Sequence, residues 1–212
     1  MDFCVEFIKE PYLCYTEHGL HALFFSRLYS RLPPSERYLD WNGRKICRIQ
    51  KEYPTASDLG KPKRQNWDVA IIDSPLKSIS DNTDPYDYFT LHSVVEFGMN
   101  EAKEHLTDDA ARLSHSGSNT KNRYIVHLYR ISDNLSGRDW SPRSARILSA
   151  KDIESMLEDP RIGEIIVYYG RVDMTNKYKS MSCVLVKDAD GAISHLDIVA
   201  EHEKNMGSPT RS

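Results

Sequence analysis

The sequence lacks several features that would place it in a protein class at once. None of its apolar stretches approaches the roughly 20 residues that a membrane-spanning helix needs. Acidic residues among its first residues replace the basic start of a secretory signal peptide. We therefore expect a cytoplasmic protein without membrane association.

Clustered cysteines and glycine-rich loops are also missing. Cys4, Cys14, Cys47 and Cys183 are scattered, with no C-x-x-C pair and no zinc-type spacing to histidine. They are expected to be free thiols in a reducing compartment. No glycine-rich loop joins a strand to a helix, so the sequence does not support a dinucleotide or P-loop site.

An excess of positive charge is missing as well. The 212 residues carry 28 Lys and Arg against 31 Asp and Glu, a net charge of −3. Any contact with DNA or RNA must therefore come from local basic patches, for which phosphate contact and base stacking are the expected chemistry. Solvated loops are the alternative reading. The patches consist of Lys61, Lys63 and Arg64, and of Arg138, Trp140 and Arg143.

Hydrophobic periodicity predicts a mixed α/β protein. Apolar residues recur at helical spacing over 16–32, where Thr16 could cap the helix and Pro33-Pro34 ends it. Two further helices are predicted, near 100–116 and over 150–157. Strands are predicted at 46–54, 67–73, 92–98, 123–131, 163–172, 181–186 and 193–199, the last two forming a hairpin.

This order suggests a central mixed sheet flanked by helices, in a single domain. We expect the domain to span residues 1–200, with a core at about 16–131, an extension at 132–200 and a disordered tail at 201–212. The extension could enlarge the sheet or form a homodimer contact. A protein partner is also compatible with the sequence.

Acidic residues at the ends of predicted strands are the main candidates for chemistry. Asp68 begins the strand WDVAIID, Glu96 lies near the end of HSVVEFG, and Glu52 ends the strand before them. Buried charges are costly unless they are paired or bound to a metal, and carboxylates suit Mg²⁺. Asp73, at the other end of WDVAIID, competes with Asp68 for this role. Solvated strand ends or salt bridges are the plainer explanation.

The chain resembles the PD-(D/E)XK restriction endonuclease-like family in the predicted order helix, three strands, helix, strand. The stretches that carry this resemblance are IQKEYPT, RQNWDVAII and SVVEFGMNEAKEHLTDDAARL. The resemblance implies a nuclease that hydrolyses phosphodiester bonds of DNA or RNA with Mg²⁺ or Mn²⁺. Asp68 would match the metal-binding Asp and Glu96 the Glu of the E-x-K element. The Phe97 carbonyl would also bind the metal, and Glu17 would be the additional acid of the first helix.

The sequence departs from the family pattern at Gly98, which occupies the position of the E-x-K lysine. Lys103, on the following helix, or Lys51, beside Glu52, is expected to stand in for it. Lys51 and Glu52 are neighbours on a strand, so they are not expected to point the same way. The alternative is a nuclease fold that has lost catalysis and serves as a binding or interaction module.

Other polar residues have weaker functional signals. His18 and His21 lie three apart on a predicted helix, but the sequence offers no third metal ligand for them. Asp108 and Asp109 are expected on a solvated helix face. The dispersed histidines are expected at the surface or hydrogen-bonded in the core; they are His92, His105, His115 and His127.

Overall fold

The structure is a computed structural model that describes residues 1–41, 43–55, 59, 61–63, 65–75, 89–101, 103–131, 150–173 and 183–196. Its helices are α1 (Asp2–Lys9), α2 (Glu17–Arg31), η1 (Pro34–Glu36), α3 (Lys103–Ser114), η3 (Ser116–Ser118) and α4 (Ala150–Leu157). Its strands are β1 (Tyr38–Trp41), β2 (Arg44–Cys47), β3 (Ile49–Pro54), β4 (Asn66–Pro75), β5 (Phe89–Met99), β6 (Thr120–Ile131), β7 (Ile166–Asp173), β8 (Cys183–Lys187) and β9 (Ile193–Leu196).

A seven-stranded mixed sheet in the order β3-β4-β5-β6-β7-β8-β9 forms the centre of the described structure. Strands β3, β4 and β5 form an antiparallel meander, and β6 and β7 then run parallel to β5. The hairpin β8–β9 completes the sheet, and Gly191 supplies a positive φ of 91° in its turn. The α/β class and the C-terminal hairpin are therefore as the sequence predicts.

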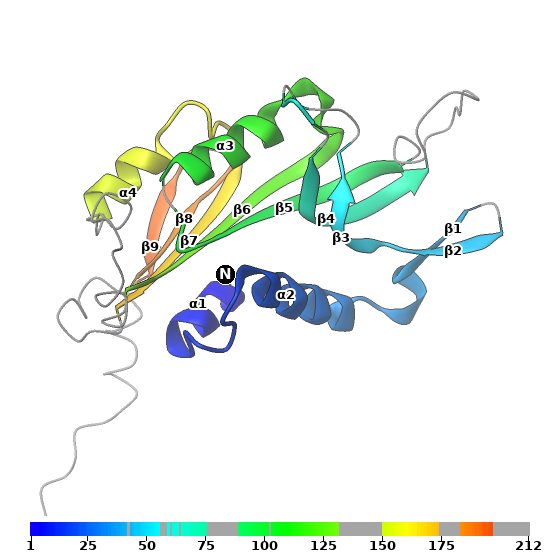
Figure 1. Ribbon diagram of the computed structural model, residues 1–212, viewed down its shortest axis with the longest axis horizontal. Coiled ribbons are helices and arrows are strands. Elements are labelled where there is room, and N and C mark those ends of the chain that lie inside the picture. The colour runs from blue at the N-terminus through cyan, green and yellow to red at the C-terminus, as the bar shows by residue number, and fades with distance from the viewer. Residues whose placement is uncertain are drawn as a thin grey trace, which may run out of the picture.

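Helices cover the sheet on both faces (Figure 1): α1 and α2 lie on one side, and α3 and α4 on the other. The core between α3, α4 and the sheet contains Leu106, Leu113 and Leu157, all fully buried. On the opposite face Phe7, Leu20 and Phe97 belong to the core beneath α1 and α2. Among the described residues, no helix is both long and apolar enough to cross a membrane.

The predicted helix over residues 16–32 is confirmed as α2. The side chain of Thr16 caps it by accepting a hydrogen bond from the Gly19 N–H at 3.1 Å. The predicted strand over 46–54 is wrong as a single element, because the chain breaks at Arg48. Residues before the break pair with β1 in a separate two-stranded sheet, and residues after it join the main sheet.

Helix α1 has no counterpart among the elements predicted from the sequence. The segment that follows it is attached to the sheet through Arg130 on β6. The buried guanidinium donates to the carbonyl oxygens of Pro11, Cys14 and Tyr15 at 2.8, 3.2 and 3.1 Å. These three groups belong to the segment between α1 and α2. A single side chain therefore fixes the path of the chain between these two helices.

The packing of α3 gives a first testable prediction. Leu106→Ala removes a fully buried side chain from the core, so the free energy of unfolding should fall by about 2–5 kcal/mol. Urea denaturation measures it. Leu13→Ala is the control, because this leucine is 50% exposed and its loss should change stability by less than about 0.5 kcal/mol. Equal effects of the two substitutions would contradict the packing described here.

Candidate active site

The candidate site begins where β4 and β5 separate. Their ladder runs from Pro75–Phe89 to Val69–Val95. Beyond that point a side chain replaces the backbone of β4 as the hydrogen-bond partner of β5. Asp68 Oδ2 accepts a hydrogen bond from the backbone N–H of Phe97 at 2.7 Å. Asp68 thus joins the two strands at the end of their pairing, and its side chain remains 19% exposed.

The carboxyl group of Glu96 lies next to that of Asp68. The two acids are close enough to interact electrostatically, although Glu96 is only 1% exposed. Burial, together with the negative charge of Asp68, raises the pKa of Glu96 well above its ordinary value. Within the described part of the chain, neither Glu96 oxygen has a hydrogen-bond partner. The strands therefore bring together two of the predicted site residues.

Arg112 on α3 partly balances this negative charge. Its Nη2 lies 3.2 Å from Glu96 Oε1 and 2.5 Å from Asp109 Oδ1. Burial alone would lower the pKa of Arg112, but the two carboxylates outweigh it and raise that pKa. The expectation of a solvated Asp109 is wrong, since this residue is only 1% exposed. It belongs to the charged cluster behind Glu96.

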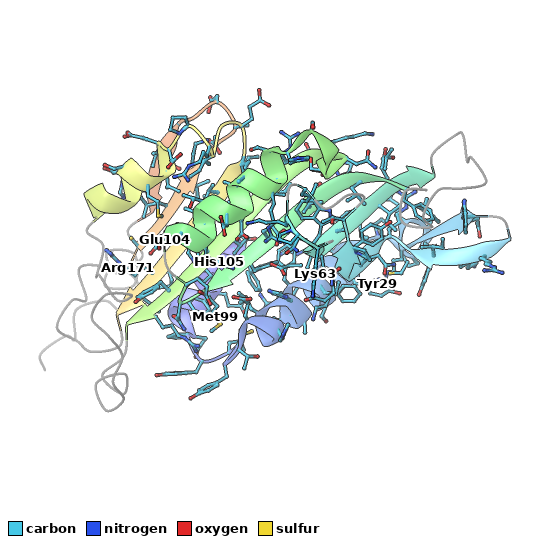
Figure 2. The ribbon with its side chains drawn as sticks, turned by 45° about the horizontal axis from the view of Figure 1, so that its top comes forward. Tyr29, Lys63, Met99, Glu104, His105 and Arg171 are labelled. Atoms are coloured by element: carbon cyan, nitrogen blue, oxygen red, sulfur yellow. The ribbon has the colours of Figure 1, made fainter. Side chains whose placement is uncertain are left out.

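Two histidines occupy the space beside Gly98, the position at which the resemblance would place a lysine. A Cβ atom at position 98 would lie 2.6 Å from His127 Nε2 and 3.2 Å from His105 Nδ1. The parallel register that pairs Gly98 with His127 explains this proximity. A lysine therefore cannot fit here unless the His127 ring moves. Figure 2 labels His105 on α3 and Met99 at the end of β5, which mark this region.

The two rings differ in environment. Burial, with a smaller effect from His105, lowers the pKa of His127 to about 3, so His127 is neutral at physiological pH. Neither of its nitrogens has a hydrogen-bond partner among the described residues, contrary to the expectation for a core histidine. His105 is 37% exposed, and its Nδ1 lies 3.4 Å from Asp109 Oδ2.

Glu17 connects the first turn of α2 to the end of β5. Its Oε2 accepts a hydrogen bond from the Met99 N–H at 3.0 Å. Burial raises the pKa of Glu17, and the nearby charge of Asp68 raises it further. The additional acid expected from the sequence therefore lies within electrostatic reach of the Asp68 carboxylate.

Glu52 lies at the edge of the site, beside the histidines of α2. Its Oε1 is 3.9 Å from His18 Nδ1 and 3.8 Å from His21 Nδ1. Its φ of 52° is unusual for a residue with a side chain and breaks the alternation of β3. Burial lowers the pKa of His21; among the nearby charges, Asp68 and Glu52 raise that pKa and Lys51 lowers it. That the Lys51 and Glu52 side chains point apart stays a prediction from the sequence.

The remaining predicted residues fall into two groups. Lys61 forms an ion pair with Asp108 at 3.5 Å, and Lys63 is exposed, so this short segment lies near α3. The other basic and aromatic candidates lie outside the described residues, as do the Lys103 side chain and the predicted tail at 201–212. Those candidates are Arg64, Arg138, Trp140 and Arg143.

Asp73, the competitor of Asp68, lies five residues further along β4. It forms an ion pair with Lys121 at 2.5 Å, and this hydrogen-bonded lysine lowers its pKa. Asp73 is thus accounted for by a surface ion pair. The geometry favours Asp68 as the acid of the site.

Comparisons with known proteins found no relative of this chain. No family model matches the chain, and neither a curated protein nor a solved structure matches it. The site must therefore be interpreted from its own chemistry.

The raised pKa of Glu96 predicts how stability depends on pH. The folded state binds the Glu96 proton more tightly than the unfolded chain, so ionisation costs stability as pH rises above the ordinary value of 4.5. Glu96→Gln removes this cost. Its free energy of unfolding relative to the wild type should grow by up to about 1.4 kcal/mol per pH unit, until pH passes the folded pKa.

Urea denaturation between pH 4 and pH 8, without divalent ions, measures the difference. Glu104→Gln, on the exposed first turn of α3, is the control and should show no such trend. A difference for Glu96→Gln that stays constant with pH would contradict a raised pKa for Glu96.

Proposed function

We propose that the chain has a PD-(D/E)XK nuclease core and hydrolyses phosphodiester bonds of nucleic acid with a divalent metal ion. The element order α2-β3-β4-β5-α3-β6 supports this proposal, since the antiparallel meander precedes a helix and a parallel strand. In addition, the two acids that the resemblance selects lie on the second and third strands of the meander.

The Asp68–Glu96 pair is the observation that carries the proposal. Two interacting carboxyl groups, one of them almost fully buried, ionise together only at a high cost unless cations balance them, and Arg112 supplies a single positive charge for this cluster of acids. Glu96 Oε1 lies 3.2 Å from Arg112 Nη2, but neither Glu96 oxygen accepts a hydrogen bond within the described residues, which is typical of a site completed by an ion or by water. This donor set fits a hard cation such as Mg²⁺ or Mn²⁺.

Asp68, Glu96 and the carbonyl of Phe97 would hold the metal in this proposal. A bound Mg²⁺ supplies Lewis-acid stabilisation of charge on a phosphoryl oxygen. Two hydrogen bonds of the chain would align these ligands. The Phe97 N–H donates to Asp68, and the Met99 N–H donates to Glu17. The basic segment containing Lys61 and Lys63 is the described candidate for contact with the phosphate backbone.

His105 replaces the missing lysine as the proton acceptor in our proposal. Its Nδ1 lies beside position 98 and 3.4 Å from Asp109 Oδ2; a proton on this nitrogen would leave Nε2 to accept one. His105 is also partly exposed, as a residue that meets substrate water must be. Lys103 and Lys51 remain the alternatives from the sequence.

A second function is favoured by Arg112. Its guanidinium already lies 3.2 Å from Glu96 and offers a permanent positive charge in place of a metal ion. Such an internal pair would suit a nuclease fold that binds nucleic acid or a protein without cutting. Isothermal titration with Mg²⁺ and Mn²⁺ distinguishes the two functions, because only the enzyme requires a bound ion.

Asp68→Asn tests the proposed activity. Removal of a metal ligand should lower Mg²⁺-dependent cleavage by about 100-fold or more. The assay should use labelled single- and double-stranded DNA and RNA. Asp73→Asn is the matched control at the other end of β4 and should retain activity, because Asp73 forms an ion pair with Lys121.

The outcomes separate the alternatives. Full activity of Asp68→Asn, or loss of activity in Asp73→Asn with its fold intact, would contradict the site assignment. Wild-type protein that binds neither ion and cuts none of the substrates would instead favour the binding module.

His105→Ala tests the proton acceptor. Loss of general-base assistance should lower the cleavage rate by roughly 10²- to 10⁴-fold, while Mn²⁺ affinity stays within about 2-fold of the wild type. Lys103→Ala and Lys51→Ala are the comparison variants. If either lysine variant loses activity and His105→Ala keeps it, the lysine performs this role.

A further inference from the structure

A second cluster of metal-binding side chains lies beside the carboxylate pair, between α2 and β3. It consists of His18, His21 and Glu52, each of which places a ligand atom within 4.8 Å of the other two. The imidazole rings lie 5.7 Å apart, centroid to centroid, at an interplanar angle of 83°. Glu52 Oε1 faces both rings at 3.8 and 3.9 Å.

The local backbone explains why these three residues meet. The Thr16 cap fixes the start of α2, and a spacing of three places His18 and His21 on one side of the helix. The positive φ of Glu52 turns its side chain away from the regular strand pattern and toward them. The sequence offered two ligands, and this irregularity of β3 supplies the third.

His21 gives independent reason to expect a ligand. Its side chain is 1% exposed, yet neither ring nitrogen has a hydrogen-bond partner within the described residues. A buried imidazole normally satisfies at least one of its nitrogens. Here Nδ1 faces Glu52 and Nε2 faces Asp68, each at 3.8 Å, beyond hydrogen-bonding distance.

We infer that His18, His21 and Glu52 bind a divalent transition metal ion of the zinc class. Two imidazoles with one carboxylate are a frequent zinc ligand set, and they leave a fourth position for water or substrate. Nitrogen ligands distinguish this site from the oxygen site of Asp68 and Glu96, which suits Mg²⁺. The inference stands independently of the proposed nuclease activity.

The exposure of the ligands allows both entry and adjustment. His18 is 81% exposed and Glu52 is 45% exposed, so an ion can approach from solvent. Zinc–ligand distances of about 2.0–2.2 Å require the donor atoms to move closer than they lie now. The two exposed side chains can rotate to achieve this, while His21 provides the fixed position.

Asp68 would act on this metal site through His21. A carboxylate facing the second nitrogen of a metal-binding imidazole selects its tautomer and orients the ring. In this arrangement the metal lies at Nδ1 and the Nε2–H points toward Asp68. Asp68 is thus a positioning residue for the zinc-class site and a proposed ligand of the Mg²⁺ site.

Titration of the chelator-treated full chain with Zn²⁺, followed by calorimetry, tests the inference. Co²⁺ serves as a second probe, because its visible absorption reports nitrogen ligands and coordination geometry. We expect one strongly bound equivalent of Zn²⁺. His18→Ala and Glu52→Gln should each weaken that binding by roughly 10- to 100-fold or more. Both residues are exposed, so these variants should fold normally.

His195→Ala is the matched control, because His195 also pairs with an exposed glutamate, Glu154, but lies on β9. It should bind Zn²⁺ like the wild type. Excess Mg²⁺ should not displace the zinc. Unchanged affinity in both His18→Ala and Glu52→Gln, or loss of binding only in Glu96→Gln, would overturn the inference and assign the zinc to other groups.

Discussion

The hydrogen bond from the Phe97 N–H to Asp68 determines the geometry on which the candidate site depends. At this point β4 and β5 stop pairing, and a side chain replaces the backbone partner that Phe97 would otherwise need. The carboxyl group of Asp68 is therefore held between the strands. Glu96, the residue before Phe97 on β5, therefore lies close to Asp68. The other charged groups of the site are arranged around these two acids.

Negative charge at this position has consequences on both faces of the sheet. On the α3 face, Arg112 and His105 lie beside the acids Glu96 and Asp109. On the α2 face, His21 lies between Asp68 and Glu52. Asp68 is the residue common to the two clusters, so binding of a cation on one face would alter the electrostatic field on the other.

The sequence predicted the elements whose signal is local. Helix α2 has a capping threonine and a proline stop, and β4 and β5 are short apolar runs bounded by polar residues. Helix α1 was missed because eight residues are too few for a clear periodicity, although Cys4, Phe7 and Ile8 do form a buried face. The break at Arg48 was missed because the residues on both sides favour strands.

The candidate site was only partly predictable for a physical reason. Acids at strand ends are visible in the sequence, so Asp68 and Glu96 could be named. The positions of His105 and His127 depend on how the β5-α3-β6 crossover sets the strand register, which pairs Gly98 with His127. The direction of the Glu52 side chain depends on one backbone angle. Neither quantity has a signature in residue spacing.

The end of β5 is linked by hydrogen bonds to the two N-terminal helices and to β6. Met99 is bound by Glu17 from α2, and the next residue, Asn100, accepts a hydrogen bond from the backbone N–H of Arg130 at 2.7 Å. The Arg130 guanidinium in turn binds the carbonyl groups between α1 and α2. These bonds form a closed loop of connections around the strand terminus. A displacement of the first two helices would therefore be transmitted to the backbone that carries Glu96 and Phe97, rather than absorbed at the surface.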